Sequence, residues 1–125
     1  MTAAGDTQVL VVDDDFDIRD TLRELLEIEG FRVAIAANGR EAIEQLRNGV
    51  SPRLILLDLM MPEMSGWEFR SEQLRDPALA EIPVVILSAT PDVARTAAAL
   101  HAAGFVRKPF DLDQLIEMVQ ERVPK

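Results

Sequence analysis

The chain has 125 residues, which at about 100–200 residues per domain predicts a single domain. Its 22 Asp and Glu exceed its 13 Lys and Arg, and the resulting formal charge of −9 opposes direct binding to nucleic acid. The absence of cysteine excludes disulfides, thiolate metal sites and cysteine nucleophiles, and it favours a reducing, cytoplasmic location.

No segment has the pattern of a targeting or membrane sequence. The start, MTAAGDTQ, lacks the basic region and apolar stretch of a signal peptide. Apolar runs such as 54–57 and 84–87 are far shorter than the roughly 18 residues that span a bilayer. We therefore expect no membrane association.

Five short runs rich in Val, Ile and Leu predict strands. They lie at residues 9–12, 31–36, 54–57, 84–87 and 105–106. Most are continuously apolar, which is typical of strands covered on both faces of a parallel sheet. Between the runs lie helical patterns, such as the apolar stripe of Ile18, Leu22, Leu25 and Leu26.

Capping signals mark the ends of these helices. Asn38, Ser65 and Asp111 each stand three residues before a Glu or Gln, and Thr90 before Pro91 predicts another N-cap. Gly30 and Gly49 follow helical patterns, where a left-handed residue ends a helix at low cost.

The alternation of strand and helix predicts one α/β domain of (βα)5 order. Right-handed crossovers then give a doubly wound, five-stranded parallel sheet with helices on both faces. We expect this domain to cover residues 8–123, between an N-terminal tail at 1–7 and a C-terminal end at 124–125.

Polar residues follow the predicted strands and should meet at one edge of the sheet, where ligands bind in such folds. Carboxylates, a hydroxyl and an ammonium are brought together there. They belong to Asp13, Asp14 and Asp15 after the first strand, Asp58 after the third, Ser88 after the fourth and Lys108 after the fifth.

Clustered carboxylates repel one another, so they favour a hard divalent cation. Mg²⁺ takes oxygen ligands and retains waters, which suits Asp14 and Asp58, with Asp13 binding directly or through water. A carboxylate can also attack phosphorus to form an aspartyl phosphate. Lys108 and the Ser88 hydroxyl could then bind phosphoryl oxygens.

Each of these residues alone also has a structural explanation. Acidic residues after a first strand often cap the next helix, and a lone lysine is commonly a solvated surface residue. Asp58 differs, because it ends a strand expected to be central, and a buried charge is costly unless it is paired or metal-bound.

Taken together, the motifs resemble the receiver domains of two-component response regulators, a flavodoxin-like family that includes CheY. The matching stretches are VLVVDDDFDIR at 9–19, GFRVAIAANGREAI at 30–43, LILLDLMMPEMSG at 54–66, PVVILSAT at 83–90 and VRKPF at 106–110.

The resemblance implies a role for each residue of the site. Asp58 is the phosphoacceptor, and Mg²⁺ is held by Asp13, Asp14, Asp58 and the backbone carbonyl of Met60. Lys108 matches the lysine that binds the phosphoryl group, and the bond from Lys108 to Pro109 matches one that is typically cis. Ser88 and Phe105 match the switch hydroxyl and the switch aromatic residue.

The resemblance also implies partners. A histidine kinase or histidine phosphotransfer protein would supply the phosphoryl group, and a downstream effector would respond. Phosphorylation would shift the face made by the fourth helix, fifth strand and fifth helix, without turnover catalysis.

Three features near the fifth strand depart from the family pattern. Phe105 stands where Tyr is common, so it packs but donates no hydrogen bond. His101 to Gly104 replace the usual Gly-Ala pair, and we expect Gly104 to supply the backbone freedom of this turn. The alanine-rich stretch 94–103 offers few large side chains, which gives the hypothesis of a mobile fourth helix.

Three other functions compete with this interpretation. A haloacid-dehalogenase-type phosphatase would use the Asp-x-Asp of Asp13 and Asp15, but Asp17 stands where its motif needs Thr or Val, and Asp58 has no role. A flavodoxin-like nucleotide binder is disfavoured because three carboxylates repel phosphate. The third is a receiver fold that binds partners independently of phosphorylation.

Overall fold

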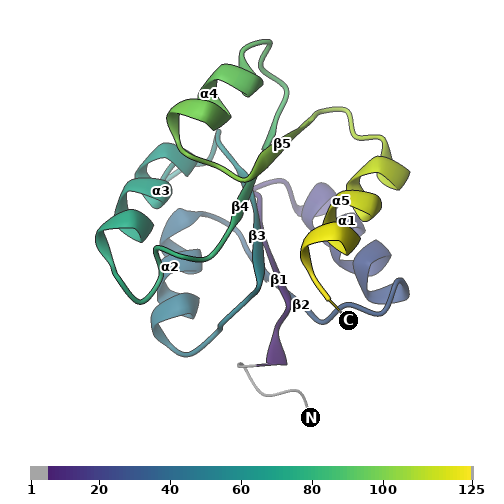
Figure 1. Cartoon of the computed structure of the whole chain (residues 1–125), viewed down its shortest axis with the longest axis horizontal. Helices are drawn as coiled ribbons and strands as arrows, with labels where there is room; N and C mark the ends of the chain where they lie inside the picture. The colour runs from purple at the N-terminus through teal and green to yellow at the C-terminus, as the bar shows by residue number, and fades with distance from the viewer. Residues whose placement is uncertain (1–5, 125) are drawn as a thin grey trace.

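The computed structural model describes residues 6–124, in which strands and helices alternate along the chain (Figure 1). The strands are β1 (Val9–Val12), β2 (Val33–Ala36), β3 (Leu54–Asp58), β4 (Val84–Ser88) and β5 (Gly104–Arg107). The helices are α1 (Phe16–Ile28), α2 (Gly39–Arg47), α3 (Gly66–Arg75), α4 (Val93–Ala99) and α5 (Leu112–Arg122). Most of the predicted N-terminal tail lies outside the described residues, and the domain limits 8–123 remain a prediction.

The strands form one parallel sheet in the order β2-β1-β3-β4-β5. From β1 the chain moves first to one side of the sheet and then, from β3, to the other. This reversal makes the sheet doubly wound and places a switch point between β1 and β3. The predicted fold class is confirmed.

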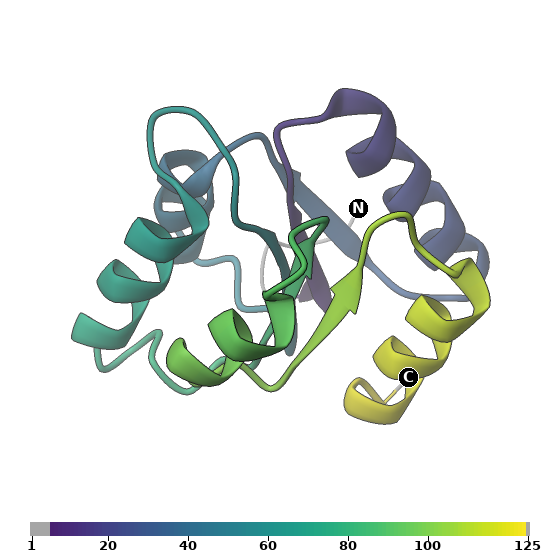
Figure 2. The ribbon, with the colours of Figure 1, turned by 90° about the horizontal axis from the view of Figure 1, so that it is seen from above.

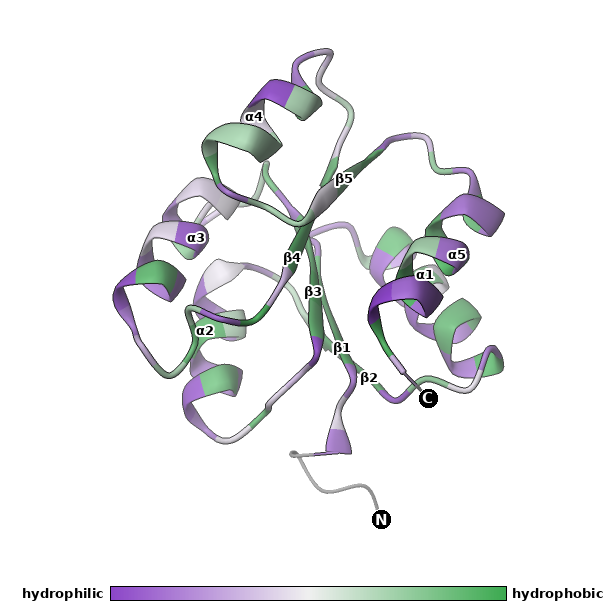
Figure 3. Ribbon diagram, viewed as in Figure 1, coloured by the Kyte–Doolittle hydropathy of each residue, from purple (hydrophilic) through white to green (hydrophobic). Residues whose placement is uncertain are grey.

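Helices cover both faces of the sheet (Figures 1 and 2). One face packs against α2, α3 and α4, and the other packs against α1 and α5. Every residue of β1, β3 and β4 is buried, which explains why these strands are continuously apolar (Figure 3) up to Asp58 and Ser88 at the ends of β3 and β4. Within residues 6–124, no helix has the length and apolar character needed to cross a membrane.

Three of the predicted N-caps are confirmed, and one is wrong. Asn38 caps α2, Ser65 caps α3 in a capping box, and Asp111 caps α5. Thr90 does not cap α4, whose N-cap residue is Asp92 and has no side-chain cap bond. The Thr90 amide and hydroxyl are instead bonded to the Ser88 hydroxyl.

The predicted helix-ending glycines are confirmed for Gly30 and Gly49, which have φ angles of 96° and 105°. The prediction for Gly104 is wrong. Gly104 is the first residue of β5, and the left-handed residue of this turn is His101, with φ 54°.

Candidate functional site

The alternation of side chains along the strands explains which polar groups meet at the carboxyl edge. Asp13 lies two residues after Val11, and Lys108 lies two residues after Val106, so both continue the face that packs on α1 and α5. Asp58 is paired in register with Leu87, which belongs to the same face. These three side chains therefore project on one side of the sheet edge.

An ion-paired cluster results. The Lys108 Nζ lies 3.0 Å from Asp13 Oδ2 and 3.6 Å from Asp58 Oδ1. Asp13 is fully buried, and its other oxygen accepts a hydrogen bond from the Asp15 backbone at 2.9 Å. The Lys108 side chain is only 17% exposed, so its charge acts in partly desolvated surroundings.

The same edge has the donor set of a cation site. Asp13, Asp14 and Asp58 each offer a carboxylate oxygen, and these oxygens lie within 4.8 Å of one another. One lysine does not neutralise three carboxylates, two of which are buried. Hard oxygen donors with an excess of negative charge, open to solvent at the exposed Asp14, fit Mg²⁺ with retained waters.

Burial and charge tune the carboxyl group of Asp58. Desolvation, followed by the negative charge of Asp13, raises the pKa of Asp58 to about 6. Lys108 and a hydrogen bond from the Met60 backbone oppose this rise. The carboxylate is therefore mostly ionised at neutral pH, which keeps it available as a nucleophile.

Backbone contacts fix the loops that carry these carboxylates. The Arg19 guanidinium on α1 donates to the Asp13 carbonyl at 3.0 Å. A Cβ at Gly66 would lie 2.7 Å from the Asp58 carbonyl oxygen, so only glycine lets α3 begin this close to the loop after β3. Arg19 is not among the residues predicted from the sequence, although its place six residues after Asp13 in the same stretch is a usable signal.

Ser88 and Phe105 lie on the opposite face of the sheet from the carboxylates, on the side of α4. The Ser88 Oγ lies 3.0 Å from the Thr90 Oγ1 and accepts the Thr90 amide at 3.1 Å, so its hydrogen bonds go to Thr90. Phe105 is half-buried against the core beneath α4, and the Arg107 guanidinium lies 5.5 Å from its ring centroid. The contacts of Thr90 and Arg107 are not predicted from the sequence.

Two predictions concern the loops that flank the cluster. The cis peptide bond is confirmed, and the backbone metal ligand stays a prediction. Met60 places its side chain in solvent, 65% exposed, and its carbonyl remains a predicted rather than an observed metal ligand. The peptide bond from Lys108 to Pro109 is cis, as the resemblance implies.

The sequence profile of the family described as the response regulator receiver domain matches residues 9–120. The chain belongs to this family. Its members generally act as signalling modules rather than turnover enzymes. The phosphatase and nucleotide-binding alternatives are left without support, because the match covers nearly the whole chain.

Curated relatives of this receiver domain include single-domain and longer proteins. An uncharacterised 14.6 kDa protein of Leptolyngbya boryana is 37% identical over 97% of this chain and 93% of that protein. Response regulator MprA of Mycolicibacterium vanbaalenii is 36% identical over 87% of this chain. That match spans only 47% of MprA, about half its length.

Solved structures agree with this assignment. The chemotaxis protein CheY4 of Vibrio cholerae is 30% identical, with a TM-score of 0.83, over 93% of this chain and 98% of that chain. The response regulator TrrA of Thermotoga maritima, solved in complex with Mg²⁺-BeF, is 32% identical with a TM-score of 0.80, over 92% and 97% of the two chains.

Proposed function

We propose that this receiver domain accepts a phosphoryl group on Asp58 in a two-component phosphorelay. The observation that carries the proposal is a buried, mostly ionised carboxylate at the end of β3, with the Lys108 ammonium 3.6 Å away. Two further carboxylates lie within 4.8 Å of it, which gives the composition of a phosphoryl-transfer site.

The chemistry follows from these groups. An Asp58 carboxylate oxygen forms a bond to phosphorus while the bond from phosphorus to the donor breaks, and the donor leaves with that electron pair. Lys108 lies where it can bind a phosphoryl oxygen and oppose the added negative charge. Bound Mg²⁺, held by Asp13, Asp14, Asp58 and the Met60 carbonyl, would supply further charge neutralisation.

The signal would pass through the hydroxyl at the end of β4. A phosphoryl group on Asp58 attracts the Ser88 hydroxyl as a donor, and Ser88 then rearranges its hydrogen bonds with Thr90. The loop from β4 to α4 changes as a result, and Phe105 repacks beneath α4. We infer that the face of α4, β5 and α5 then changes its affinity for an effector.

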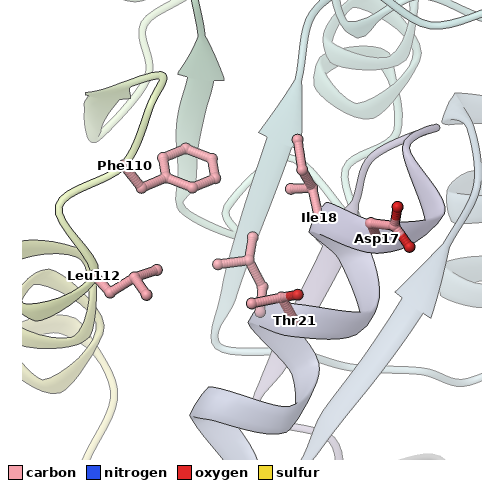
Figure 4. A pocket seen from close by; sticks show the side chains of 6 residues that line it. Asp17, Ile18, Thr21, Phe110 and Leu112 are labelled. Atoms are coloured by element: carbon pink, nitrogen blue, oxygen red, sulfur yellow. The ribbon is translucent and has the colours of Figure 1, made fainter.

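The phosphodonor would dock beside the carboxylates. An apolar cavity of about 180 Å³ opens between α1 and the start of α5 (Figure 4). Phe110 at its rim follows Lys108 by two residues, and the neighbouring Phe16 is 64% exposed. We propose that a histidine kinase or histidine phosphotransfer protein binds there. The cavity is lined by Asp17, Ile18, Thr21, Leu22, Phe110 and Leu112.

Intact mass spectrometry after incubation with acetyl phosphate and Mg²⁺ tests the proposal. We expect the wild type to gain one phosphoryl group per chain. Asp58→Asn and a metal-free sample should gain none, while Glu44→Gln, a control at an exposed carboxylate on α2, should gain one. Continued release of phosphate from an ester substrate would instead indicate an enzyme.

Failure of the folded wild type to gain mass in the presence of Mg²⁺ would contradict the proposal. The receiver fold would then serve as a binding module that does not depend on phosphorylation. The cytoplasmic location remains a prediction from the composition.

A further inference from the structure

A buried arginine joins α3 to the carboxyl-terminal end of α4. Arg70 is 5% exposed, and its Nε donates to the Leu100 carbonyl at 3.0 Å. Its Nη2 donates to the His101 carbonyl at 2.9 Å, and its Nη1 donates to the Gln73 Oε1 at 2.8 Å. One planar side chain therefore binds two carbonyls that are about 30 residues away in sequence.

Gln73 extends this network into the segment between α3 and β4. It is fully buried, and its Nε2 donates to the carbonyls of Leu79 and Ile82, each at 3.0 Å. Within residues 6–124, no carboxylate lies within 4.0 Å of the Arg70 guanidinium, so neutral oxygens alone satisfy this charge. Breaking the network would leave a buried cation and several carbonyls unsatisfied, which is costly.

The location of the charge adds to the stability of this contact. Leu100 is the C-cap residue of α4, and His101 follows it. Cations are favoured at the carboxyl end of a helix, where unpaired carbonyls and the helix dipole concentrate negative charge. The His101 and Ala102 amides also bond back to the Ala98 and Ala97 carbonyls, which closes this end as a Schellman motif.

Within residues 6–124, the amino-terminal end of α4 is held by weaker polar contacts: just before the helix, the Pro91 carbonyl accepts one exposed hydrogen bond, from the Arg107 guanidinium at 3.3 Å. Asp92 caps this end without a side-chain hydrogen bond, and the helix has only seven residues, of which Val93 and Ala97 are buried. This end follows the segment that carries Ser88 and Thr90. The two ends of one short helix are therefore held very differently.

We infer that Arg70 is a positioning residue that anchors the carboxyl-terminal end of α4 to α3, so that α4 responds to the phosphoacceptor site by movement of its amino-terminal end. The anchoring of α4 by Arg70 is a property of the unphosphorylated protein, whereas the movement of the amino-terminal end of α4 rests on the proposed phosphorylation of Asp58. The conformational change then occurs at one end of α4 rather than in the whole helix.

Amide hydrogen exchange followed by NMR on the intact chain tests the anchor without phosphorylation. We expect the Ala102 amide, bonded to Ala97, to be at least ten times better protected than the Thr96 amide, bonded to Asp92. Arg70→Met should lower the protection of Ala102 at least tenfold, and Arg70→Lys should lower it less because the cation is retained. Arg75→Met, at an exposed arginine of the same helix, should leave it unchanged.

Equal protection of Ala102 in wild type and Arg70→Met would overturn the anchor. A thermal melt of each variant establishes that it is folded. If Arg70→Met does not fold, Arg70→Lys and Gln73→Met decide the question, because the first loses the planar fork and the second loses the Nη1 acceptor. Both should lower the protection of Ala102, and unchanged protection in both would again overturn the anchor.

A second experiment repeats the hydrogen-exchange measurement after treatment with acetyl phosphate and Mg²⁺. In wild type, protection should change at Thr96 and stay constant at Ala102, whereas in folded Arg70 variants it should change at both. A change confined to Ala102 in wild type would overturn the movement. If the protein gains no phosphoryl group, the proposed function is contradicted, and the proposed movement of α4 with it. The hydrogen-exchange experiment on the unphosphorylated protein would still test whether Arg70 anchors α4.

Discussion

Asp58 shows how a single buried side chain can oppose the stability of the fold that holds it. Its carboxylate is largely removed from water and lies next to that of Asp13, and one lysine neutralises only part of the combined charge. Removing solvent and adding a like charge both disfavour the ionised form. The residue that makes the site reactive is therefore expected to destabilise the metal-free protein at neutral pH.

Because the ionised Asp58 carboxylate destabilises the folded state, the free energy of unfolding should depend on pH in a definite direction. The pKa of Asp58 is about 6 in the folded chain, above its ordinary value of 3.8, so the folded state binds the proton more tightly. Its contribution to stability is therefore greatest at low pH and is lost as the pH rises from about 4 through about 6. Asp58→Asn should be more stable than wild type by roughly 2–3 kcal/mol at pH 8, and the difference should shrink towards pH 4.

Urea unfolding of both proteins in metal-free buffer across this pH range measures the difference. Glu81→Gln, which neutralises an exposed carboxylate between α3 and β4, serves as the control and should follow wild type. Identical unfolding free energies for Asp58→Asn and wild type at pH 8 would contradict the electrostatic argument.

The sequence predicts the contacts of the carboxylates and Lys108 better than it predicts the hydrogen-bond partner of Ser88. Asp13, Asp58 and Lys108 follow directly from strand ends, and the alternation of strand side chains places them together. The partner of Ser88 depends on the turn after β4 and on the rotamer of a small hydroxyl, neither of which leaves a periodic signal. Thr90 has the sequence pattern of an N-cap, but its side-chain hydroxyl is hydrogen-bonded to the Ser88 hydroxyl instead.

At the scale of elements, the turn after α4 departs from the way α1 and α2 end. Gly30 and Gly49 follow α1 and α2 with positive φ angles, as their sequence positions predict. After α4 the left-handed position is filled by His101, whose Cβ is disfavoured in that conformation. The sequence misplaces this position at Gly104, because the glycine pattern gives no sign that another residue has adopted the strained conformation.

His101→Gly should therefore stabilise the protein by about 1 kcal/mol, because glycine adopts positive φ without steric cost. His101→Ala is the matched control, since it removes the imidazole and retains the Cβ, and it should give no such gain. Urea unfolding distinguishes the two substitutions. If His101→Gly were no more stable than His101→Ala, the positive φ angle of residue 101 would not lower the stability of the protein, and the prediction would be contradicted.

For the whole molecule, the alternating pattern predicts the (βα)5 fold and the edge of the sheet that carries the site. The pattern does not predict the order β2-β1-β3-β4-β5 or the helices that cover each face, because these depend on packing between distant segments. The Arg70 network is likewise long-range, since two of its acceptors, the Leu100 and His101 carbonyls, lie at the end of a different helix. Local sequence thus predicts the elements and the ends of the strands, whereas tertiary packing decides how α4 is held.

The charge of the whole chain leads to the last prediction. With a formal charge of −9 and three carboxylates within 4.8 Å at one edge of the sheet, the folded protein should be stabilised by Mg²⁺, which the unfolded chain binds poorly. At a Mg²⁺ concentration about ten times the Kd, linkage gives about 1.4 kcal/mol, or a rise in Tm of about 3–6 °C for a domain of this size. Sodium chloride at matched ionic strength should not reproduce the rise.

Asp14→Ala distinguishes a bound ion from general screening. In metal-free buffer this variant should melt at or above the wild-type temperature, because it removes a like charge next to Asp13 and Asp58. In Mg²⁺ it should lose most of the rise in Tm, because it also removes an oxygen ligand. Asp17→Ala, an equal change of net charge at the start of α1, should keep the rise. If Mg²⁺ raised the Tm of Asp14→Ala as much as that of wild type, the ion would be bound elsewhere, and the carboxylates at the sheet edge would need another explanation.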